Sequence, residues 1–160
     1  MSEEPYKTAI DDKLEDATAV LDAFHVVKLG TAAVDEVRRR VQQDTLGHRG
    51  RTGAPLYGIQ TILRAGAENL TEKQRARLVA AIEAAPAHDE VFVAWQCAQQ
   101  LRSAYHQKDL AEGRKIAEKV VESFHTCPIP EIARLGRTLR RWTDAFLAYF
   151  TTNRSSNGGT

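Results

Sequence analysis

Asp22 is the residue whose surroundings best suit it to do chemistry. It follows the short apolar run ATAVL at residues 17–21 and precedes AFHVVKLG, a segment with helical character. In open α/β sheets the working residues gather at the carboxyl ends of strands, and carboxylate oxygens are the ligands that Mg²⁺ takes in proteins. Two such ions, bridged by acids from separate elements, activate the attacking oxygen and stabilise the leaving oxygen of a phosphodiester. Asp22 is therefore a candidate metal ligand and catalytic residue.

A second role for Asp22 is structural. Aspartate is a preferred N-cap residue, because its side chain accepts a hydrogen bond from a free backbone N–H in the first helical turn. A helix that begins near Phe24 would place Asp22 at that position. One acid alone cannot build a two-metal site, so the residue pattern by itself favours the cap, and both roles stay open.

Arginines at helical spacing form a second candidate site. Arg134, Arg137, Arg140 and Arg141 recur at three- and four-residue spacing, which predicts that they share one face of a helix. Arginine binds phosphate oxygens, so this face is a candidate contact for a DNA backbone, a contact that positions a protein without selecting a sequence. The alternative is a solvated face that keeps an amphipathic helix soluble. A run of three arginines at residues 38–40 has the same two interpretations.

The histidines and cysteines do not form a metal-binding pattern. None of the five histidines falls at HExxH or zinc-finger spacing, and Cys97 and Cys127 lie 30 positions apart with no CxxC pair. We expect both cysteines to be reduced core residues, and His25 to pack beside the candidate acid. Trp95 and Trp142 lie in apolar stripes, which predicts core positions rather than base stacking.

Helices must position most of these residues. The expected helices cover about residues 25–46, 56–70, 71–86, 91–105, 109–124 and 132–149. Apolar side chains at three- and four-residue spacing predict them. Thr71 opens the capping-box sequence TEKQ, Asp109 is an expected N-cap, and Gly47 is the expected stop of the first helix.

The sequence thus predicts a mostly α fold with one short strand near residues 17–21. A lone strand cannot satisfy its backbone hydrogen bonds, so this one requires neighbours that the chain barely supplies. The chain has 160 residues, enough for one domain with a sizeable core. Its final residues are small and polar with no periodicity, so residues 153–160 are expected to be disordered.

Charge and hydropathy indicate which partners and which cellular location the sequence favours. The 22 basic and 21 acidic residues leave a net charge of +1. Residues 1–22 hold seven acids and two lysines, so the positive charge lies in the rest of the chain, which favours an anionic partner there. No run of 18 apolar residues and no apolar signal sequence occur, which predicts a soluble cytoplasmic protein.

Several motifs together resemble a known family. The segments VLDAFHVVKL, VDEVRRRVQQDTLGHRGRTGAPLYGIQTILRAG, VAWQCAQQLRSAYH and IPEIARLGRTLRRW follow one another as in the catalytic region of bacterial insertion-sequence transposases of the ISL-three family. The resemblance covers nearly the whole chain. It implies a ribonuclease-H-like core in which an aspartate, aspartate and glutamate triad holds two divalent ions, Mg²⁺ or Mn²⁺, for DNA strand cleavage and transfer. It also implies a long helical insertion between the second and third acids.

On this resemblance, Asp22 matches the second acid of the triad. Residues 1–30 are then expected to be a remnant of the ribonuclease-H-like core, residues 31–152 the all-helical insertion region, and residues 153–160 the tail. The implied partner is transposon-end DNA. A second copy of the chain or an intact transposase is a further expected partner, and no membrane is implied.

The sequence departs from the family pattern at the other two acids. Met1 occupies the position of the first aspartate, and the family's glutamate directly follows a motif similar to SNGGT, with which this chain ends at Thr160. Ion affinity depends on the number of ligands, so we expect the 160-residue chain alone neither to cut nor to join DNA. The alternative function is a non-catalytic helical module that binds DNA or an intact transposase.

Overall fold

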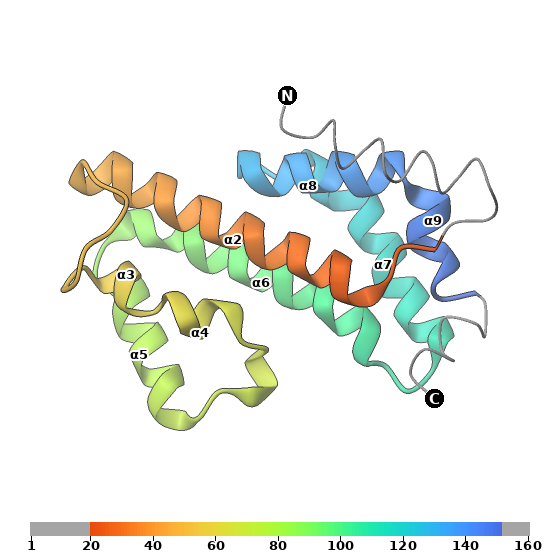
Figure 1. The fold of residues 1–160 in the computed structure, drawn as a ribbon, viewed down its shortest axis with the longest axis horizontal. Coiled ribbons are helices and arrows are strands. Elements are labelled where there is room, and N and C mark those ends of the chain that lie inside the picture. Colours follow the sequence, from red (N-terminus) through yellow and green to blue (C-terminus); the bar gives the residue numbers. More distant parts are fainter. Residues whose placement is uncertain (1–19, 152–160) are drawn as a thin grey trace.

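The structure, a computed structural model, describes residues 20–151, and every regular element in that range is helical (Figure 1). The α-helices are α2 (Ala23–Leu46), α3 (Pro55–Gly58), α4 (Gln60–Arg64), α5 (Glu72–Glu83), α6 (Asp89–Ser103), α7 (Leu110–Ser123), α8 (Pro130–Arg141) and α9 (Thr143–Ala148). Short 3-10 turns link several of them. The prediction of a mostly α fold is confirmed. No helix within residues 20–151 is long and apolar enough to cross a membrane.

The long helix α2 runs through the middle of the molecule and supplies much of the core (Figure 1). Its valines at three- and four-residue spacing, Val34, Val37 and Val41, are buried, as the sequence predicts. Gly47 ends the helix in the left-handed conformation, with φ 79°, and its N–H donates to the carbonyl of Gln43. Glycine adopts this conformation without a Cβ clash, so the helix stops where the sequence predicts.

The helix α6 packs along α2, and the other helices cover this pair (Figure 1). The helices α3, α4 and α5 lie against one half of the pair, and α7, α8 and α9 lie against the other. Gly136 of α8 contacts the backbone of His125 so closely that a Cβ would have no room. The middle of α8 therefore packs on the preceding turn, Phe124–Thr126, at a distance that only glycine permits.

Two predicted helix starts are confirmed. The N–H of Gln74 donates to the Thr71 hydroxyl at 3.1 Å, and the Thr71 N–H donates to the Gln74 side chain at 2.9 Å, which completes the capping box of α5. The N–H of Ala111 donates to the Asp109 carboxylate at 3.0 Å at the start of α7. Each pairing satisfies a backbone donor that the helix itself leaves free.

Two of the expected helices are divided. Residues 56–70 form α3, α4 and a 3-10 turn, because Ile59 and Ala65 leave the helical conformation. The stripe at residues 132–149 is divided into α8 and α9 at Trp142, whose φ of −104° and ψ of 32° are not helical. The apolar period continues across both breaks, so periodicity alone predicts one helix in each case.

The strand expected near residues 17–21 is absent from the part that the structure describes. Residues 17–19 lie outside the described range, and Val20 and Leu21 belong to no strand. The Leu21 N–H donates instead to the carbonyl of Ala145 in α9, at 3.1 Å. This backbone donor is therefore satisfied by a helix and not by a neighbouring strand, and a ribonuclease-H-like core stays a prediction.

The predicted division of the chain falls partly outside the described residues. The expected boundary between residues 30 and 31 lies inside α2, which continues without a break from Ala23 to Leu46. Most of the expected core remnant at residues 1–30, and the tail at residues 153–160, lie beyond the range 20–151. These divisions stay predictions.

Arg40 joins three helices through ion pairs. Its guanidinium donates to Glu131 of α8 twice, from Nε to Oε2 at 2.7 Å and from Nη2 to Oε1 at 3.0 Å, and it also pairs with Glu90 of α6. The Glu131 side chain is only 12% exposed. Burial acts to raise the pKa of Glu131, but the hydrogen bonds from Arg40 outweigh it and hold this pKa below its usual range. The hydrogen bond to Glu131 likewise raises the pKa of Arg40.

Glu131→Gln is expected to lower the free energy of unfolding by about 1–3 kcal/mol, because Arg40 would keep its partly buried charge and lose the counter-charge that it binds with two hydrogen bonds. The matched control is Glu118→Gln, which breaks an exposed pair with Arg114 within α7 and should cost less than about 0.5 kcal/mol. Urea unfolding followed by far-UV circular dichroism measures both. Equal losses in the two variants would contradict a structural role for the Arg40 network.

Candidate metal ligand and nucleic-acid interface

Asp22 is the N-cap of α2. Its Oδ1 accepts a hydrogen bond from the backbone N–H of His25 at 3.1 Å, and its own backbone is extended. This is the structural role that the residue pattern favours. The side chain is exposed, and a carboxylate has acceptor sites beyond the one that the cap uses. The cap therefore orients the carboxylate and leaves an oxygen that can ligate an ion.

An aromatic cluster lies beside the end of α2 that carries Asp22. Tyr105 packs edge-to-face on Tyr149, with ring centroids 4.8 Å apart, and its centroid lies 5.1 Å from that of Phe150. Burial raises the pKa of Tyr105, and electrostatic interactions with Tyr149 and Asp22 raise this pKa further. The Tyr105 hydroxyl is buried and has no hydrogen-bond partner among residues 20–151.

Exposed side chains follow Asp22 along the first turns of α2. Phe24 is 73% exposed, and the Lys28 ammonium lies 5.7 Å from the centroid of its ring. The side chain of His25, which the sequence predicts to pack beside the acid, is exposed, and it is the backbone of this residue that contacts Asp22. The sequence does not predict the exposure of Phe24, because an apolar phenylalanine is normally expected to be buried.

Within residues 20–151, no group of three histidine, cysteine, aspartate or glutamate side chains could hold a metal ion together. The assignment of Asp22 as a metal ligand therefore stays a prediction. A cation of this kind takes six or more oxygen ligands, several of them from water. Such a site would need oxygen ligands besides the carboxylate of Asp22.

The helix α8 lies antiparallel to α2, and three contacts set the register. The contacts are Arg40 with Glu131, Glu36 with Arg134, and Leu21 with Ala145 just beyond α8. Residue numbers thus fall along α2 as they rise along α8 and α9 (Figure 1). The C-terminal end of α8 therefore lies toward the end of α2 that carries Asp22.

The four arginines of α8 are all exposed. Arg134, Arg137 and Arg141 fall within about 60° of one another around the helix axis, whereas Arg140 lies about 120° from Arg134. Arg140 is turned toward the preceding segment, where its Nη1 lies 2.8 Å from Nε2 of His125. We refer to Arg134, Arg137 and Arg141 as the α8 stripe.

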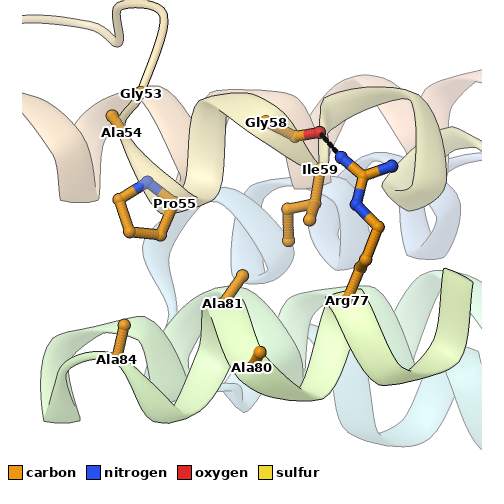
Figure 2. Close-up of a pocket in the computed structure, with 9 residues that line it drawn as sticks. All are labelled: Gly53, Ala54, Pro55, Gly58, Ile59, Arg77, Ala80, Ala81 and Ala84. Carbon is orange, nitrogen blue, oxygen red and sulfur yellow. Dashed lines mark hydrogen bonds between the residues drawn. The ribbon is translucent and has the colours of Figure 1, made fainter. Parts of the chain in front are cut away.

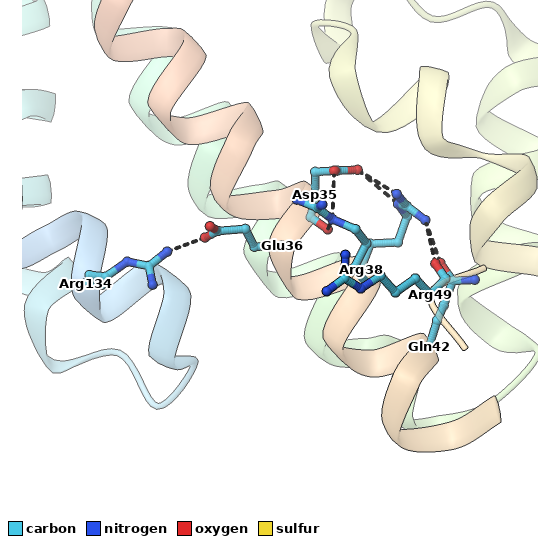
Figure 3. Close-up of polar contacts among 7 residues, drawn as sticks. Asp35, Glu36, Arg38, Gln42, Arg49 and Arg134 are labelled. Atoms are coloured by element: carbon cyan, nitrogen blue, oxygen red, sulfur yellow. Dashed lines mark hydrogen bonds and ion pairs between the residues drawn. The ribbon is translucent and has the colours of Figure 1, made fainter. Parts of the chain in front are cut away.

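Two members of the α8 stripe carry free cationic groups. The Arg134 guanidinium pairs with Glu36 of α2 (Figure 3). The side chains of Arg137 and Arg141 make no hydrogen bond or ion pair with any residue in the range 20–151. These two groups can therefore bind phosphate oxygens without breaking a contact within the described part of the chain.

The arginine run at residues 38–40 is used largely inside the protein. Arg38 is 4% exposed and donates to Asp35 at 2.8 Å and to Gln42 at 2.6 Å (Figure 3). Arg40 holds the network between α2, α6 and α8. Arg38 and Arg40 thus use their guanidinium groups within the protein, whereas the Arg39 side chain is 42% exposed and pairs with Asp35. A phosphate contact of this run stays a prediction.

The remaining histidine, cysteine and tryptophan predictions concern the core. His88 is buried, with Nδ1 2.7 Å from a backbone carbonyl of α5. Trp95 and Trp142 are buried, as predicted. Cys97 and Cys127 are free, partly buried thiols, and burial raises the pKa of Cys97 to about 11.

A shallow apolar hollow of about 380 Å³ lies between α3 and α5 (Figure 2). Pro55, Ile59, Ala80 and Ala84 are among its lining residues. Arg77 closes one edge by donating from Nη2 to the Gly58 carbonyl at 3.0 Å. Binding sites use a few placed polar groups to orient a ligand, and this apolar wall offers almost none, so we assign the hollow no ligand.

Two substitutions separate the roles of Asp22. Asp22→Ala removes the cap and should lower the free energy of unfolding by about 1 kcal/mol. Asp22→Asn keeps a capping oxygen and should stay within about 0.5 kcal/mol of the wild-type value, although it loses the charge that a cation requires. Thermal unfolding followed by circular dichroism measures both variants. A loss of the same size in the two variants would contradict the capping geometry.

The chain is similar to known transposases. A family model described as Transposase, of the ISL-three type, matches residues 1–160. Two curated relatives from Mycobacterium tuberculosis, strains CDC 1551 / Oshkosh and ATCC 25618 / H37Rv, are both named Transposase for insertion sequence element IS1557. Each is 26% identical over 152 residues, an alignment that covers 82% of this chain and 33% of the relative.

The chain thus spans about a third of the length of these curated relatives. No solved structure matches it. The family match, however, extends over the helices as well as the segment around Asp22, so it does not depend on one motif. Because the family model covers residues 1–160, the chain belongs to the ISL-three family of transposases.

Proposed function

We propose that this chain carries the second acid of a transposase catalytic triad together with a helical insertion, and that it serves in metal-dependent DNA strand cleavage and transfer. The hydrogen bond from the Leu21 N–H to the Ala145 carbonyl, at 3.1 Å, supports this most directly. A region inserted into a compact fold must leave that fold and return to it at nearby points. This bond holds the two ends of the helical region together.

The second and third acids of the family triad flank the helical region, so the two ends of this region must lie close together for the acids to share a site. Asp22 directly follows Leu21, and the family's third acid follows a motif matched at Thr160, nine residues beyond Thr151. Nine residues span at most about 30 Å. The hydrogen bond between Leu21 and Ala145 holds α9 near Asp22, which is the arrangement that a site shared with the third acid requires.

Asp22 would serve in that site as one oxygen ligand of Mg²⁺ or Mn²⁺. When bound, a pair of such ions activates the attacking oxygen and stabilises the leaving oxygen of a phosphodiester. The role of the described residues in this site would be to hold the carboxylate of Asp22 in position. The hydrogen bond from the His25 N–H limits its rotation, and the bond between Leu21 and Ala145 fixes the backbone that precedes it.

The α8 stripe would hold the DNA backbone near that acid. Arg137 and Arg141 expose guanidinium groups that have no partner among residues 20–151. The antiparallel register turns the end of α8 toward Asp22. Contacts to phosphates position a duplex without reading its sequence, so the stripe would guide DNA toward the candidate ligand. Pairing with a second transposase chain stays a prediction.

Residues 1–160 alone should neither cut nor join DNA, because a divalent ion held by one carboxylate keeps most of its waters and binds weakly. The assay incubates labelled transposon ends with the chain and Mg²⁺ or Mn²⁺, and resolves the products on a denaturing gel. Cleavage that disappears in Asp22→Ala would overturn this expectation. In a transposase chain that supplies all three acids, cleavage that survives Asp22→Asn would overturn the assignment of Asp22 as a ligand.

The α8 stripe predicts DNA binding that weakens with salt. Replacing both Arg137 and Arg141 by alanine should lower the slope of log affinity against log salt concentration by about two, since each phosphate contact contributes about 0.9. The control replaces Arg114 and Lys115 of α7, exposed cations that pair within their own helix. Fluorescence anisotropy with a labelled duplex measures the affinities. Slopes that fall equally in the two double variants would contradict the assignment.

A further inference from the structure

A polar groove of about 580 Å³ lies between α2 and the start of α8. Its lining residues are Glu36, Arg39, Arg40, Gln43, Asp44, Arg49, Glu131 and Arg134. Arg134 belongs to both the groove and the α8 stripe, so the two surfaces are continuous. The groove thus extends the arginine surface away from Asp22, toward the C-terminal end of α2.

The carboxylates of the groove are engaged by arginines. Arg40 binds Glu131 with two hydrogen bonds and lies 3.9 Å from Asp44. Arg134 pairs with Glu36. Arg40 thus serves as counter-charge to both Glu131 and Asp44, and Arg134 to Glu36, which reduces the repulsion that a bound anion would meet.

The arginines of the groove keep donors that the described residues do not use. A guanidinium carries five N–H donors. Arg134 engages one nitrogen with Glu36, and Arg39 engages its Nε with Asp35 at 3.2 Å. The exposed side chain of Arg49 makes no hydrogen bond or ion pair with residues 20–151. Three guanidinium groups with free donors around one groove suit an anion with several oxygen acceptors.

Buried contacts fix the backbone that carries Arg49. Arg38 donates to Gln42 at 2.6 Å and to the carbonyl of Arg49 at 3.5 Å (Figure 3). The next residue, Gly50, has φ 127°, and a Cβ there would meet the Gln42 amide and the Tyr57 ring. The loop therefore lies close against α2, and Arg49 lines the groove from a positioned backbone.

We propose that this groove is a second subsite for DNA phosphate, with Arg39, Arg49 and Arg134 as its donors. The inference rests on the proposed function, since the anion is taken to be a backbone phosphate of the duplex that the α8 stripe holds. A helix rises about 1.5 Å per residue, so Arg39 lies about 25 Å along α2 from Asp22. That length corresponds to about seven base pairs of B-form DNA, and contacts at both ends of α2 would fix the direction of the duplex.

The test compares two arginines of one loop. Arg49 lines the groove, whereas Arg51 is exposed on the same loop and does not line it. With a labelled duplex of about 20 base pairs, we expect Arg49→Ala to weaken binding by the 160-residue chain several-fold and to lower the salt slope by about one. Arg49→Lys should keep most of the slope, because it keeps the charge. Arg51→Ala should match the wild type, and thermal unfolding verifies that each variant is folded.

The outcomes separate this subsite from the proposed function. Unchanged binding in Arg49→Ala, or equal weakening in both loop variants, would overturn the subsite. If replacing Arg137 and Arg141 lowers the salt slope and Arg49→Ala does not, the α8 stripe stands and only the groove assignment falls. A wild-type chain that binds no duplex at low salt would overturn both.

Discussion

The pairing of α2 with α8 and α9 is the constraint on which the rest of the structure depends. At one end Arg40 holds the start of α8 against α2 and α6 through Glu131 and Glu90. At the other end the Leu21 N–H bonds to α9. These two attachments fix both the direction and the register of α8. The position of the arginine stripe relative to Asp22 follows from them, as does the groove that the start of α8 forms with α2.

Asp22 caps α2, and on the proposed function the same carboxylate would also bind a divalent ion. The hydrogen bond that caps α2 also orients the carboxylate, so the residue needs no separate support. The N-terminus of a helix carries a partial positive charge, which favours the carboxylate and opposes a bound cation. Asp22 by itself is therefore a poor ion site, and a tightly held ion would require further carboxylates. On the proposed function, those carboxylates would be the other two acids of the triad.

The sequence predicts the features that depend on neighbouring residues, such as helix caps, and fails to predict those that depend on contacts between distant parts of the chain. The caps at Thr71 and Asp109 and the stop at Gly47 involve hydrogen bonds within four residues, so residue types and spacing are enough to predict them. The division of residues 132–149 at Trp142 is not visible in the apolar pattern, because both helices bury the same stripe.

The same distinction applies to the candidate site. The cap at Asp22 was predictable, and the strand expected before it was suggested by apolar residues. Leu21 is indeed buried, at 8% exposure, but its amide bonds to a helix in the described structure. The sequence could not predict that Arg38 is buried or that Arg40 pairs with two other helices, since both depend on side chains from distant parts of the chain. Nor could it predict that the Arg49 side chain has no partner among residues 20–151, since the sequence does not define the path of its loop.

The two ends of the helical region meet beside Asp22, and a distance measurement between spin labels tests this arrangement. In a chain with Cys97 and Cys127 replaced by alanine, labels are attached to cysteines at the exposed positions Phe24 and Asp144, and in a second sample at Leu46 and Asp144. Since 22 helical residues span about 33 Å, the account predicts a separation in the first sample that is shorter by roughly 20 Å or more than in the second. Equal separations, or a longer one in the first sample, would contradict it.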